Sequence, residues 1–245
     1  MPTQPLHGKS ALVTGGARRI GREIALALAR AGADVAITCR TSQAEATQTV
    51  REIEALGSNA IALECDVRSE ASVRQALTAA NTRFGRLDVL VNNAAVFGSA
   101  ALDRMTIEQW DTVFETNTRG PFLVAREAIA HLRAVHGRII NIGSLGGIHP
   151  WASHAHYCAS KAALHMLTQA MAKAFAPEVS VNCVAPGWID LDAHPSEDAL
   201  RFAARTPMQR NGTADDVALA VLFFATGPRF VTGQILAVDG GLGLS

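Results

Sequence analysis

Residues 10–38 read SALVTGGARRIGREIALALARAGADVAIT, and the order of apolar and glycine residues in this stretch decides the fold. A short apolar run at 10–15 stops at glycines, residues 19–31 carry apolar side chains at helical spacing, and a second apolar run follows at 33–38. Parallel neighbouring strands need a long crossover, usually a helix. The stretch therefore predicts a strand, a helix and a second strand parallel to the first.

The same alternation continues to the end of the chain. Further strands are expected at 59–64, 87–92, 137–142, 179–184 and 234–238, and further helices at 43–56, 70–84, 107–134, 156–175 and 213–225. The strand candidates show little polar alternation, which is typical of strands covered by helices on both faces. No repeat, charge block or linker divides the sequence. We therefore expect residues 1–245 to form one α/β domain, a doubly wound seven-stranded parallel sheet with helices on both faces.

The composition excludes several function classes. Twenty-two basic residues balance twenty-two acidic ones, so the charge gives no general attraction to nucleic acid or to an anionic membrane. The apolar runs fall far short of the ~20 residues that span a bilayer, and the first ten residues lack the layout of a secretory signal. The four cysteines form no close pair, which fits neither a zinc site nor a disulfide framework. We expect a soluble, cytoplasmic protein with no nucleic-acid or membrane partner.

One long stretch, 187–212, shows no clear pattern. A loop of this length inside a compact domain is usually functional, often a lid over a substrate, although a surface excursion without a role is the alternative. Asp190 and Asp192 in this stretch are interpreted as solvated carboxylates rather than reacting acids.

The turn after the first strand has the composition of a phosphate loop. Glycine permits tight turns and close backbone approach, and the N-terminus of the following helix favours a pyrophosphate. Glycine-rich turns also occur for packing reasons, but this one follows the first strand of an alternating chain. The predicted cofactor-binding residues of this loop are Gly15, Arg18, Arg19, Ile20 and Gly21.

The end of the second strand indicates which dinucleotide binds. In dinucleotide-binding folds an acidic residue there binds the ribose 2′-hydroxyl and repels a 2′-phosphate. This chain has no carboxylate at that point, whereas Arg40 can pair with a phosphate and Thr41 and Ser42 can donate hydrogen bonds. Solvated side chains on a surface turn are the alternative. The pattern favours NADP(H) over NAD(H).

Tyr157 and Lys161 are the candidates for proton transfer. Tyr157 is the only tyrosine, and the four-residue spacing places Lys161 on the same face of a helix, one turn away. A phenol has an ordinary pKa of ~10, and a neighbouring ammonium group lowers it. A proton donor for a carbonyl/alcohol couple needs this tuning. A buried tyrosine beside a lysine with no chemical role is the alternative.

Tyr157-Cys158-Ala159-Ser160-Lys161 resembles the Y-x-x-x-K motif of the short-chain dehydrogenases/reductases. Ser144 lies thirteen residues earlier, at the spacing of that family's catalytic serine, and Asn117 matches its catalytic asparagine. The other matching segments are Asn92–Ala95 (N-N-A-G in the family), Asp66-Val67, Pro186–Ile189 (P-G-x-I) and Val238–Gly241. The resemblance covers residues 8 to 243.

The resemblance implies a Rossmann fold and hydride transfer between NADPH and a small-molecule carbonyl substrate. Ser144 would hydrogen-bond the carbonyl oxygen, Tyr157 would protonate it, and Lys161 would lower the Tyr157 pKa and bind the nicotinamide ribose. Asn117 would complete a proton path through water. The further cofactor contacts implied are Asp66 and Val67 on the adenine side, and Asn93, Ala94, Ala95, Pro186, Gly187 and Ile189 towards the nicotinamide.

Three positions depart from the family pattern, and they bear on the subtype. Arg19 and Ala95 replace glycines, and Leu191 replaces a frequent threonine. Arg19 resembles the pteridine reductases, but Ser144 does not, since those enzymes would carry an aspartate there. The 3-oxoacyl-[acyl-carrier-protein] reductase type is the competing interpretation, although segment 149–156 offers no Arg or Lys to an acidic carrier protein. A dinucleotide-binding regulatory protein without catalysis is a third, which the complete catalytic set disfavours.

Several other residues near the predicted site have a structural explanation as well as a functional one. His149, His154 and His156 are interpreted as pocket or surface residues, with no metal site expected. Phe97, Trp151 and Trp188 are interpreted equally well as an aromatic substrate pocket or as packing, and Cys158 as a small buried filler. The apolar side chains of 107–134 and 156–175 exceed one stripe, which predicts a homo-oligomer, a dimer at least. The resemblance implies a four-helix interface and often a tetramer.

Overall fold

A computed structural model describes residues 4–191 and 196–244. Its main sheet has seven strands in the order β3-β2-β1-β4-β5-β6-β9, and every neighbouring pair is parallel. The strands are β1 (Ser10–Val13), β2 (Asp34–Cys39), β3 (Ala60–Glu64), β4 (Val89–Asn92), β5 (Arg138–Ile142), β6 (Ser180–Pro186) and β9 (Ile235–Val238). The predicted seven-stranded parallel sheet is confirmed.

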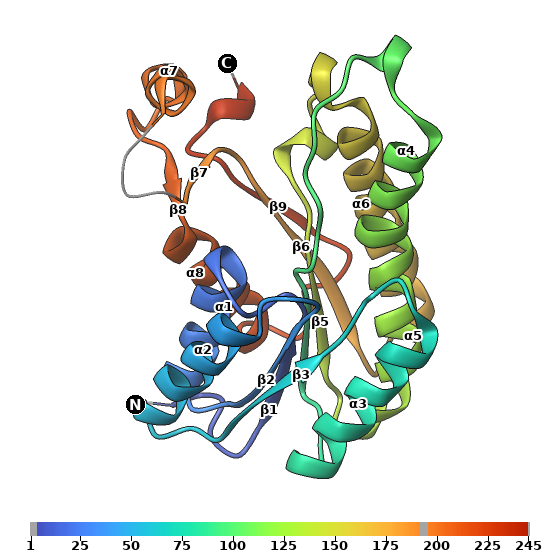
Figure 1. Ribbon diagram of the computed structural model, residues 1–245. Coiled ribbons are helices and arrows are strands. Elements are labelled where there is room, and N and C mark those ends of the chain that lie inside the picture. Colours follow the sequence, from blue (N-terminus) through green and yellow to red (C-terminus); the bar gives the residue numbers. More distant parts are fainter. Residues whose placement is uncertain (1–3, 192–195, 245) are drawn as a thin grey trace.

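Helices cover both faces of this sheet (Figure 1). The helices are α1 (Arg19–Arg30), α2 (Gln43–Ala55), α3 (Glu70–Phe84), α4 (Ile107–Phe114), α5 (Gly120–Ala134), α6 (Ala155–Phe175), α7 (Glu197–Arg205) and α8 (Ala214–Thr226). α1 packs against α8 and α2 on one face, and α3 packs against α5 on the other. This is the doubly wound arrangement that the alternation of strands and helices predicts.

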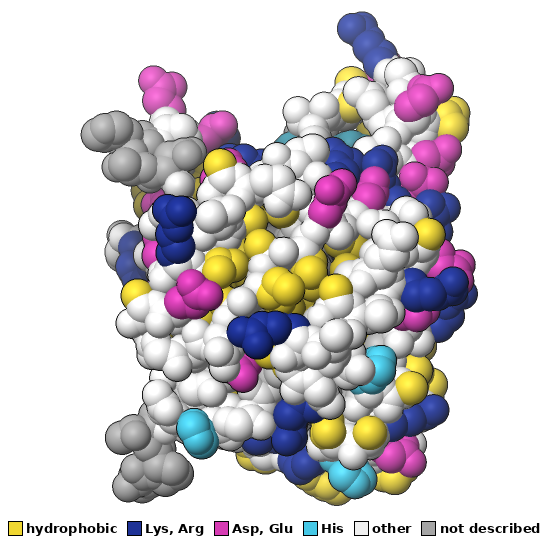
Figure 2. All heavy atoms as spheres, turned by 60° about the horizontal axis from the view of Figure 1, so that its bottom comes forward, with side chains coloured by type: hydrophobic (Ala, Val, Ile, Leu, Met, Phe, Trp, Pro, Cys, Tyr) yellow, Lys and Arg dark blue, Asp and Glu magenta, His cyan; other side chains and the backbone are white. Residues whose placement is uncertain are grey.

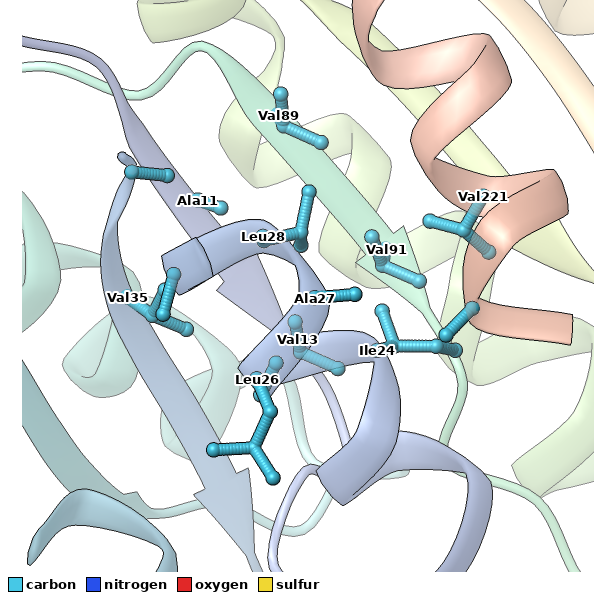
Figure 3. Close-up of a cluster of buried hydrophobic side chains, with 14 of the residues drawn as sticks. Ala11, Val13, Ile24, Leu26, Ala27, Leu28, Val35, Val89, Val91 and Val221 are labelled. Carbon is cyan, nitrogen blue, oxygen red and sulfur yellow. The ribbon is translucent and has the colours of Figure 1, made fainter. Parts of the chain in front are cut away.

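Two apolar cores, one on each face, explain why the strands lack polar alternation. Figure 3 shows Ile24 and Leu28 of α1 among Val13 and Val91 of the sheet and Val221 of α8, and all five are fully buried. The intervening strand residues, such as Leu12, Leu90 and Ile139, pack into the second core beneath α3 and α5. Burying each such side chain contributes about 1.5–3 kcal/mol to folding.

The predicted helix over 107–134 is interrupted in the middle. Glu115–Arg119 form a turn of π-helix between α4 and α5. Gly120 follows it, and a Cβ there would lie 2.9 Å from Val67 Cγ2, so only glycine allows this close approach. Such π-turns occur frequently at functional sites, and this one contains Asn117.

In the stretch 187–212, the described residues 187–191 and 196–212 contain more regular structure than the sequence pattern predicts. β7 (Ile189–Asp190) pairs with β8 (Gly212–Thr213), and α7 begins after Ser196, whose hydroxyl accepts a hydrogen bond from the Ala199 backbone nitrogen. Asp190 is exposed, as expected of a solvated carboxylate, and it also accepts hydrogen bonds from Asn211 Nδ2 at 3.0 and 3.2 Å. Asp192 lies outside the described residues.

The surface carries its charges in a mixed pattern. On the face shown in Figure 2, basic and acidic side chains are interspersed around a central group of hydrophobic side chains. Within residues 4–191 and 196–244, no helix is both long and apolar enough to cross a membrane.

Candidate active site

The site is built at the carboxyl ends of the strands. Because the strands are parallel, these ends meet at one edge of the sheet, where α/β folds bind ligands. The predicted site residues other than Asn117 lie at one of these ends, shortly after it, or on a helix that starts there, and Asn117 lies in the π-turn between α4 and α5. The cofactor candidates follow β1 (Gly15, Arg18, Arg19, Ile20, Gly21), β2 (Arg40, Thr41, Ser42), β3 (Asp66, Val67) and β4 (Asn93, Ala94, Ala95), or lie at and after the last residue of β6 (Pro186, Gly187, and Ile189 in β7).

The glycine loop is closed by contacts that leave no room for side chains. A Cβ on Gly21 would lie 2.3 Å from the Gly15 carbonyl oxygen and 2.5 Å from Asn93 Nδ2. Asn93 Nδ2 donates to the carbonyl oxygens of Thr14 and Gly15 at 2.9 and 3.0 Å. The loop after β1 is thereby tied to the end of β4.

The first turn of α1 is suited to an anion. Its N-cap residue Arg18 makes no side-chain capping bond, and the first turn holds no acidic residue. The backbone N–H groups of the turn are thus free of a side-chain cap, and the helix dipole favours negative charge there. Arg18 and Arg19 are both exposed beside it.

Arg19 has a backbone conformation that is typical of glycine. Its φ of 54° lies in the left-handed region, which favours glycine. This conformation fits a position at which the family pattern has a glycine.

The end of β2 presents the exposed guanidinium group of Arg40. Arg40 is exposed, and its guanidinium makes no hydrogen bond or ion pair with the described residues. The carboxylate on the neighbouring strand end, Asp66, is bound instead by Arg68, with Nη2 2.6 Å from Oδ2. The hydrogen bonds from Arg68 and the charges of Arg68 and Arg40 lower the pKa of Asp66 to about 2.

The proton-transfer candidates converge where β5 meets α6. Ser144 follows β5, and its hydroxyl accepts a hydrogen bond from the Gly146 nitrogen at 3.0 Å and lies near enough to Tyr157 to lower the pKa of that phenol. Lys161 Nζ lies 5.8 Å from the centre of the Tyr157 ring and donates to the Ile142 carbonyl oxygen at 2.7 Å. The predicted Ser144, Tyr157 and Lys161 cluster is therefore present in this geometry.

The direction expected for the Tyr157 pKa is wrong for this geometry. Burial is the main cause, and it raises the pKa of Tyr157 above its ordinary value, while the nearby Ser144 hydroxyl opposes this rise. Burial also lowers the pKa of Lys161 to about 8, because its ammonium group is almost entirely removed from solvent. Tyr157 keeps its proton near neutral pH, as a proton donor must.

Asn117 connects α6 to the loop after β4. Its Oδ1 accepts from the Val96 nitrogen at 2.9 Å, and its Nδ2 donates to the Val96 oxygen at 2.9 Å and to Ser160 Oγ at 3.1 Å. Ser160 in turn donates to the Tyr157 carbonyl oxygen at 2.8 Å. The water path implied for Asn117 stays a prediction.

His165 is a residue of the site that the sequence reasoning missed. It is 5% exposed, one turn beyond Lys161 on α6, and its Nε2 accepts the Ser144 N–H at 3.4 Å. It fills the space beside Gly143 and Gly147, where added Cβ atoms would lie 2.3 and 2.6 Å from the imidazole. Burial and the Lys161 charge lower its pKa to about 4. Its four-residue spacing from Lys161 was the available signal.

Aromatic side chains gather around Tyr157. Phe97 and Trp151 both pack against the Tyr157 ring. Trp188 instead stacks on Phe202, with the two ring centroids 4.4 Å apart. Cys158 is buried beside Gly146 and lines a groove of about 660 Å³ next to Trp151. Among the described residues, no group of His, Cys, Asp and Glu could hold a metal ion.

Comparison with known proteins identifies relatives over the whole chain. A family model described as enoyl-(acyl carrier protein) reductase matches residues 15–243. A 3-oxoacyl-[acyl-carrier-protein] reductase of Synechocystis sp. is 38% identical, with 97% of this chain and 98% of the relative covered.

Solved structures agree with this. A short chain dehydrogenase from Burkholderia cenocepacia in complex with NADP is 42% identical, with a TM-score of 0.91 over 98% of this chain and 99% of the other. A blue fluorescent protein from a metagenomic library, in complex with NADPH, is 40% identical, with a TM-score of 0.92 over 98% and 99% of the two chains. The chain therefore belongs to the oxidoreductases of the short-chain dehydrogenase/reductase superfamily.

Proposed function

We propose that the protein reduces the carbonyl group of a small molecule to an alcohol with NADPH, as an oxidoreductase acting on the CH–OH/C=O couple. The observation that carries this proposal is the convergence of Ser144, Tyr157 and Lys161 at the end of β5, with the Ser144 hydroxyl near enough to Tyr157 to influence its pKa. A hydroxyl beside a protonated phenol is suited to hold and protonate a carbonyl oxygen.

The residues present fit NADP(H). The pyrophosphate would lie at the loop after β1, where the glycines leave the backbone free of side chains. It would also meet the first turn of α1, whose backbone N–H groups have no side-chain cap. Arg40, with Thr41 and Ser42, would hold the 2′-phosphate, with Arg18 or Arg19 reaching in from the loop. Asp66 and Val67 would border the adenine, and the segments 93–95 and 186–189 the nicotinamide. The NADP and NADPH complexes of the two solved relatives support this choice.

When bound, NADPH supplies a hydride to the carbonyl carbon and leaves as NADP⁺. Ser144 orients the carbonyl oxygen by a hydrogen bond, and Tyr157 gives it the proton that completes the alcohol. Lys161, a buried cation close to the Tyr157 ring, stabilises the phenolate that is left, and solvent returns the proton. Asn117 holds α6 against the loop after β4 and so keeps Tyr157 in position.

Two subtypes compete within this proposal. The Synechocystis relative favours a 3-oxoacyl substrate on acyl-carrier protein, but segment 149–156 offers no Lys or Arg to an acidic carrier. The exposed Arg19 in the phosphate loop favours a pterin substrate, while Ser144 does not. A carbonyl of low molecular mass without a carrier is the version that we favour.

We also infer a homo-oligomer, a tetramer more than a dimer. Large apolar side chains on α4, α5 and α6 are exposed in the single chain, with Ile107 72%, Phe122 42% and Met166 65% exposed. A second set lies on α8 and β9, where Phe223 is 49% exposed. Two separate apolar surfaces suit two symmetric interfaces between copies.

Within the proposed enzyme, the stretch 187–212 would act as the loop that covers the substrate. The four cysteines are free thiols, which suits a protein of the reducing cytoplasm.

The test is NADPH oxidation against a panel of ketones, aldehydes, a 3-oxoacyl thioester and a pterin. Wild-type protein should oxidise NADPH with at least one carbonyl, and Tyr157→Phe should lower kcat by about 10²–10⁴ while retaining most NADPH affinity. NADPH binding without turnover of any compound would favour the dinucleotide-binding regulatory protein instead.

A further inference from the structure

Three rings form a cluster with the ring of Tyr157, the proposed proton donor. Phe97 comes from the loop after β4, Trp151 and His154 flank a short turn before α6, and Tyr157 lies in the first turns of α6. The Phe97 ring stacks on His154 with centroids 4.6 Å apart and meets Tyr157 edge-on at 4.8 Å. Trp151 lies nearly parallel to Tyr157, with centroids 6.3 Å apart and an interplanar angle of 13°.

The cluster is held by bonds between its two segments. His154 Nδ1 hydrogen-bonds the Gly98 carbonyl oxygen at 2.8 Å, and the Ala100 nitrogen donates to the Ser153 carbonyl oxygen at 2.9 Å. Two chain segments more than fifty residues apart are thus fixed to each other beside Tyr157. The ring positions are set by the fold before any ligand arrives.

Packing in the cluster leaves much of the Phe97 side chain exposed to solvent. Its side chain is 63% exposed although it touches two rings of the cluster. Single exposed apolar residues are common on protein surfaces. This one differs because its ring contacts the group that we assign as proton donor, so a ligand at Tyr157 meets the face or edge of Phe97.

The two segments that carry the cluster also lack Asp, Glu, Lys and Arg, over residues 93–101 and 143–160. Lys161, which follows the second segment, has its Nζ 5.8 Å from the centre of the Tyr157 ring and directs it to the Ile142 carbonyl oxygen. The two segments thus offer an anionic substrate no Lys or Arg, whereas aromatic rings prefer other rings in stacked or edge-to-face contact.

Resting on the proposed function, we infer that the substrate is a neutral ketone or aldehyde carrying an aromatic ring a few bonds from its carbonyl. The ring lies against Phe97 and Trp151 while the carbonyl oxygen meets Tyr157 and Ser144. NADPH gives its hydride to the carbonyl carbon, Tyr157 gives a proton to the oxygen, and the products are the alcohol and NADP⁺.

Two ketones test this inference. They share the same carbon chain, and in both the carbonyl group is not conjugated with the ring. The pair is 4-phenylbutan-2-one and 4-cyclohexylbutan-2-one, which differ only in whether the ring is flat and aromatic. Each ring contact should favour the phenyl compound by about two- to tenfold in kcat/KM. An equal kcat/KM for the two ketones, or a preference for the cyclohexyl compound, would overturn the inference.

Substitutions of the cluster residues test whether Phe97 and Trp151 cause the preference for the phenyl ketone. Phe97→Leu and Trp151→Leu each remove a ring and keep an apolar side chain, so the phenyl-to-cyclohexyl ratio should fall towards one in both. Phe230→Leu, which removes a fully exposed ring between α8 and β9, should leave the ratio at its wild-type value. Unchanged ratios in both cluster variants would contradict the inference. If Phe97→Leu does not fold, the wild-type ratio and Trp151→Leu decide.

The two proposals fail in different ways. If neither ketone, nor any carbonyl of the panel, consumes NADPH, the proposed function is wrong. If NADPH is consumed readily with aliphatic carbonyls and without regard to an aromatic ring, the function stands and the inferred substrate class is wrong.

Discussion

His165 Nε2 accepts the backbone N–H of Ser144 at 3.4 Å, so Ser144 is held by an imidazole that must be neutral to serve as acceptor. The imidazole lies next to the Lys161 charge and is buried, and these two effects lower its pKa to about 4. The orientation of Ser144 thus depends on the His165 imidazole. Lys161, which also lies near the Tyr157 ring, disfavours the protonation of this imidazole.

This contact predicts a loss of stability in mild acid. The pKa of His165 is lower in the folded protein than the ordinary value near 6.5, so the unfolded chain binds this proton first. Stability is therefore lost as pH falls from about 6.5 towards 4, by up to about 2–3 kcal/mol from this group. Urea unfolding between pH 7.5 and 4.5 measures it, with His165→Gln as the reference.

The variant isolates His165 from other titrating groups. Burial lowers the pKa of His156 as well, and that residue is retained in His165→Gln. The free energy of unfolding should fall less steeply with acid in the variant than in the wild type. Parallel curves for the two proteins would show that His165 does not titrate in this way.

The single tyrosine makes a second prediction directly measurable. Burial raises the pKa of Tyr157, so without cofactor its phenol should ionise above the ordinary value of ~10. Absorbance near 295 nm reports only this residue, because the chain has one tyrosine. Tyr157→Phe supplies the baseline. A midpoint well below 10 would mean that Lys161 outweighs burial in the free protein.

Cofactor preference is expected to follow Arg40. A charge-assisted hydrogen bond contributes about 1.5–3 kcal/mol, so NADPH should be preferred to NADH by roughly ten- to a hundredfold in kcat/KM. Arg40→Asp should narrow or reverse this preference by repelling the 2′-phosphate. Arg30→Asp, which changes the same charge at the far end of α1, is the matched control and should retain it. Equal kcat/KM with both cofactors in the wild type would contradict the assignment.

Assembly is tested on α6. Met166 is 65% exposed on the helix that also carries Tyr157 and Lys161. Met166→Asp should introduce charge into the interface, shift the mass in solution towards the 25.9 kDa of one chain and lower activity. Light scattering with an activity assay on the same sample measures both. A wild-type protein that is monomeric and fully active would contradict the inferred oligomer.

The sequence predicted the elements whose signals are local. The glycines after residue 13 and the helical spacing over 19–31 located β1 and α1, and the spacing of Tyr157 and Lys161 placed these two side chains near each other on α6. A nine-residue helix, α7, was missed in 187–212. Its signal was short: Ser196 as N-cap, followed by Glu197 and Asp198 in the first turn.

The features that the sequence could not predict depend on distant contacts. The π-turn around Asn117 coincides with side-chain bonds to Val96 and Ser160, which are 21 and 43 residues away. Helical spacing placed Lys161 near Tyr157 but could not show that its Nζ donates to Ile142. Nor could it show that burial dominates the pKa of Tyr157. These are properties of packing rather than of spacing.

The most direct test of the central claim follows the hydride itself. NADPH carrying deuterium at the transferred position of its nicotinamide is incubated with the protein and the best carbonyl of the panel, and the alcohol is analysed by mass spectrometry. We predict that the alcohol gains one deuterium on the former carbonyl carbon, and that Tyr157→Phe slows this gain by about 10²–10⁴. An alcohol without deuterium, or equal rates in the two proteins, would contradict the account.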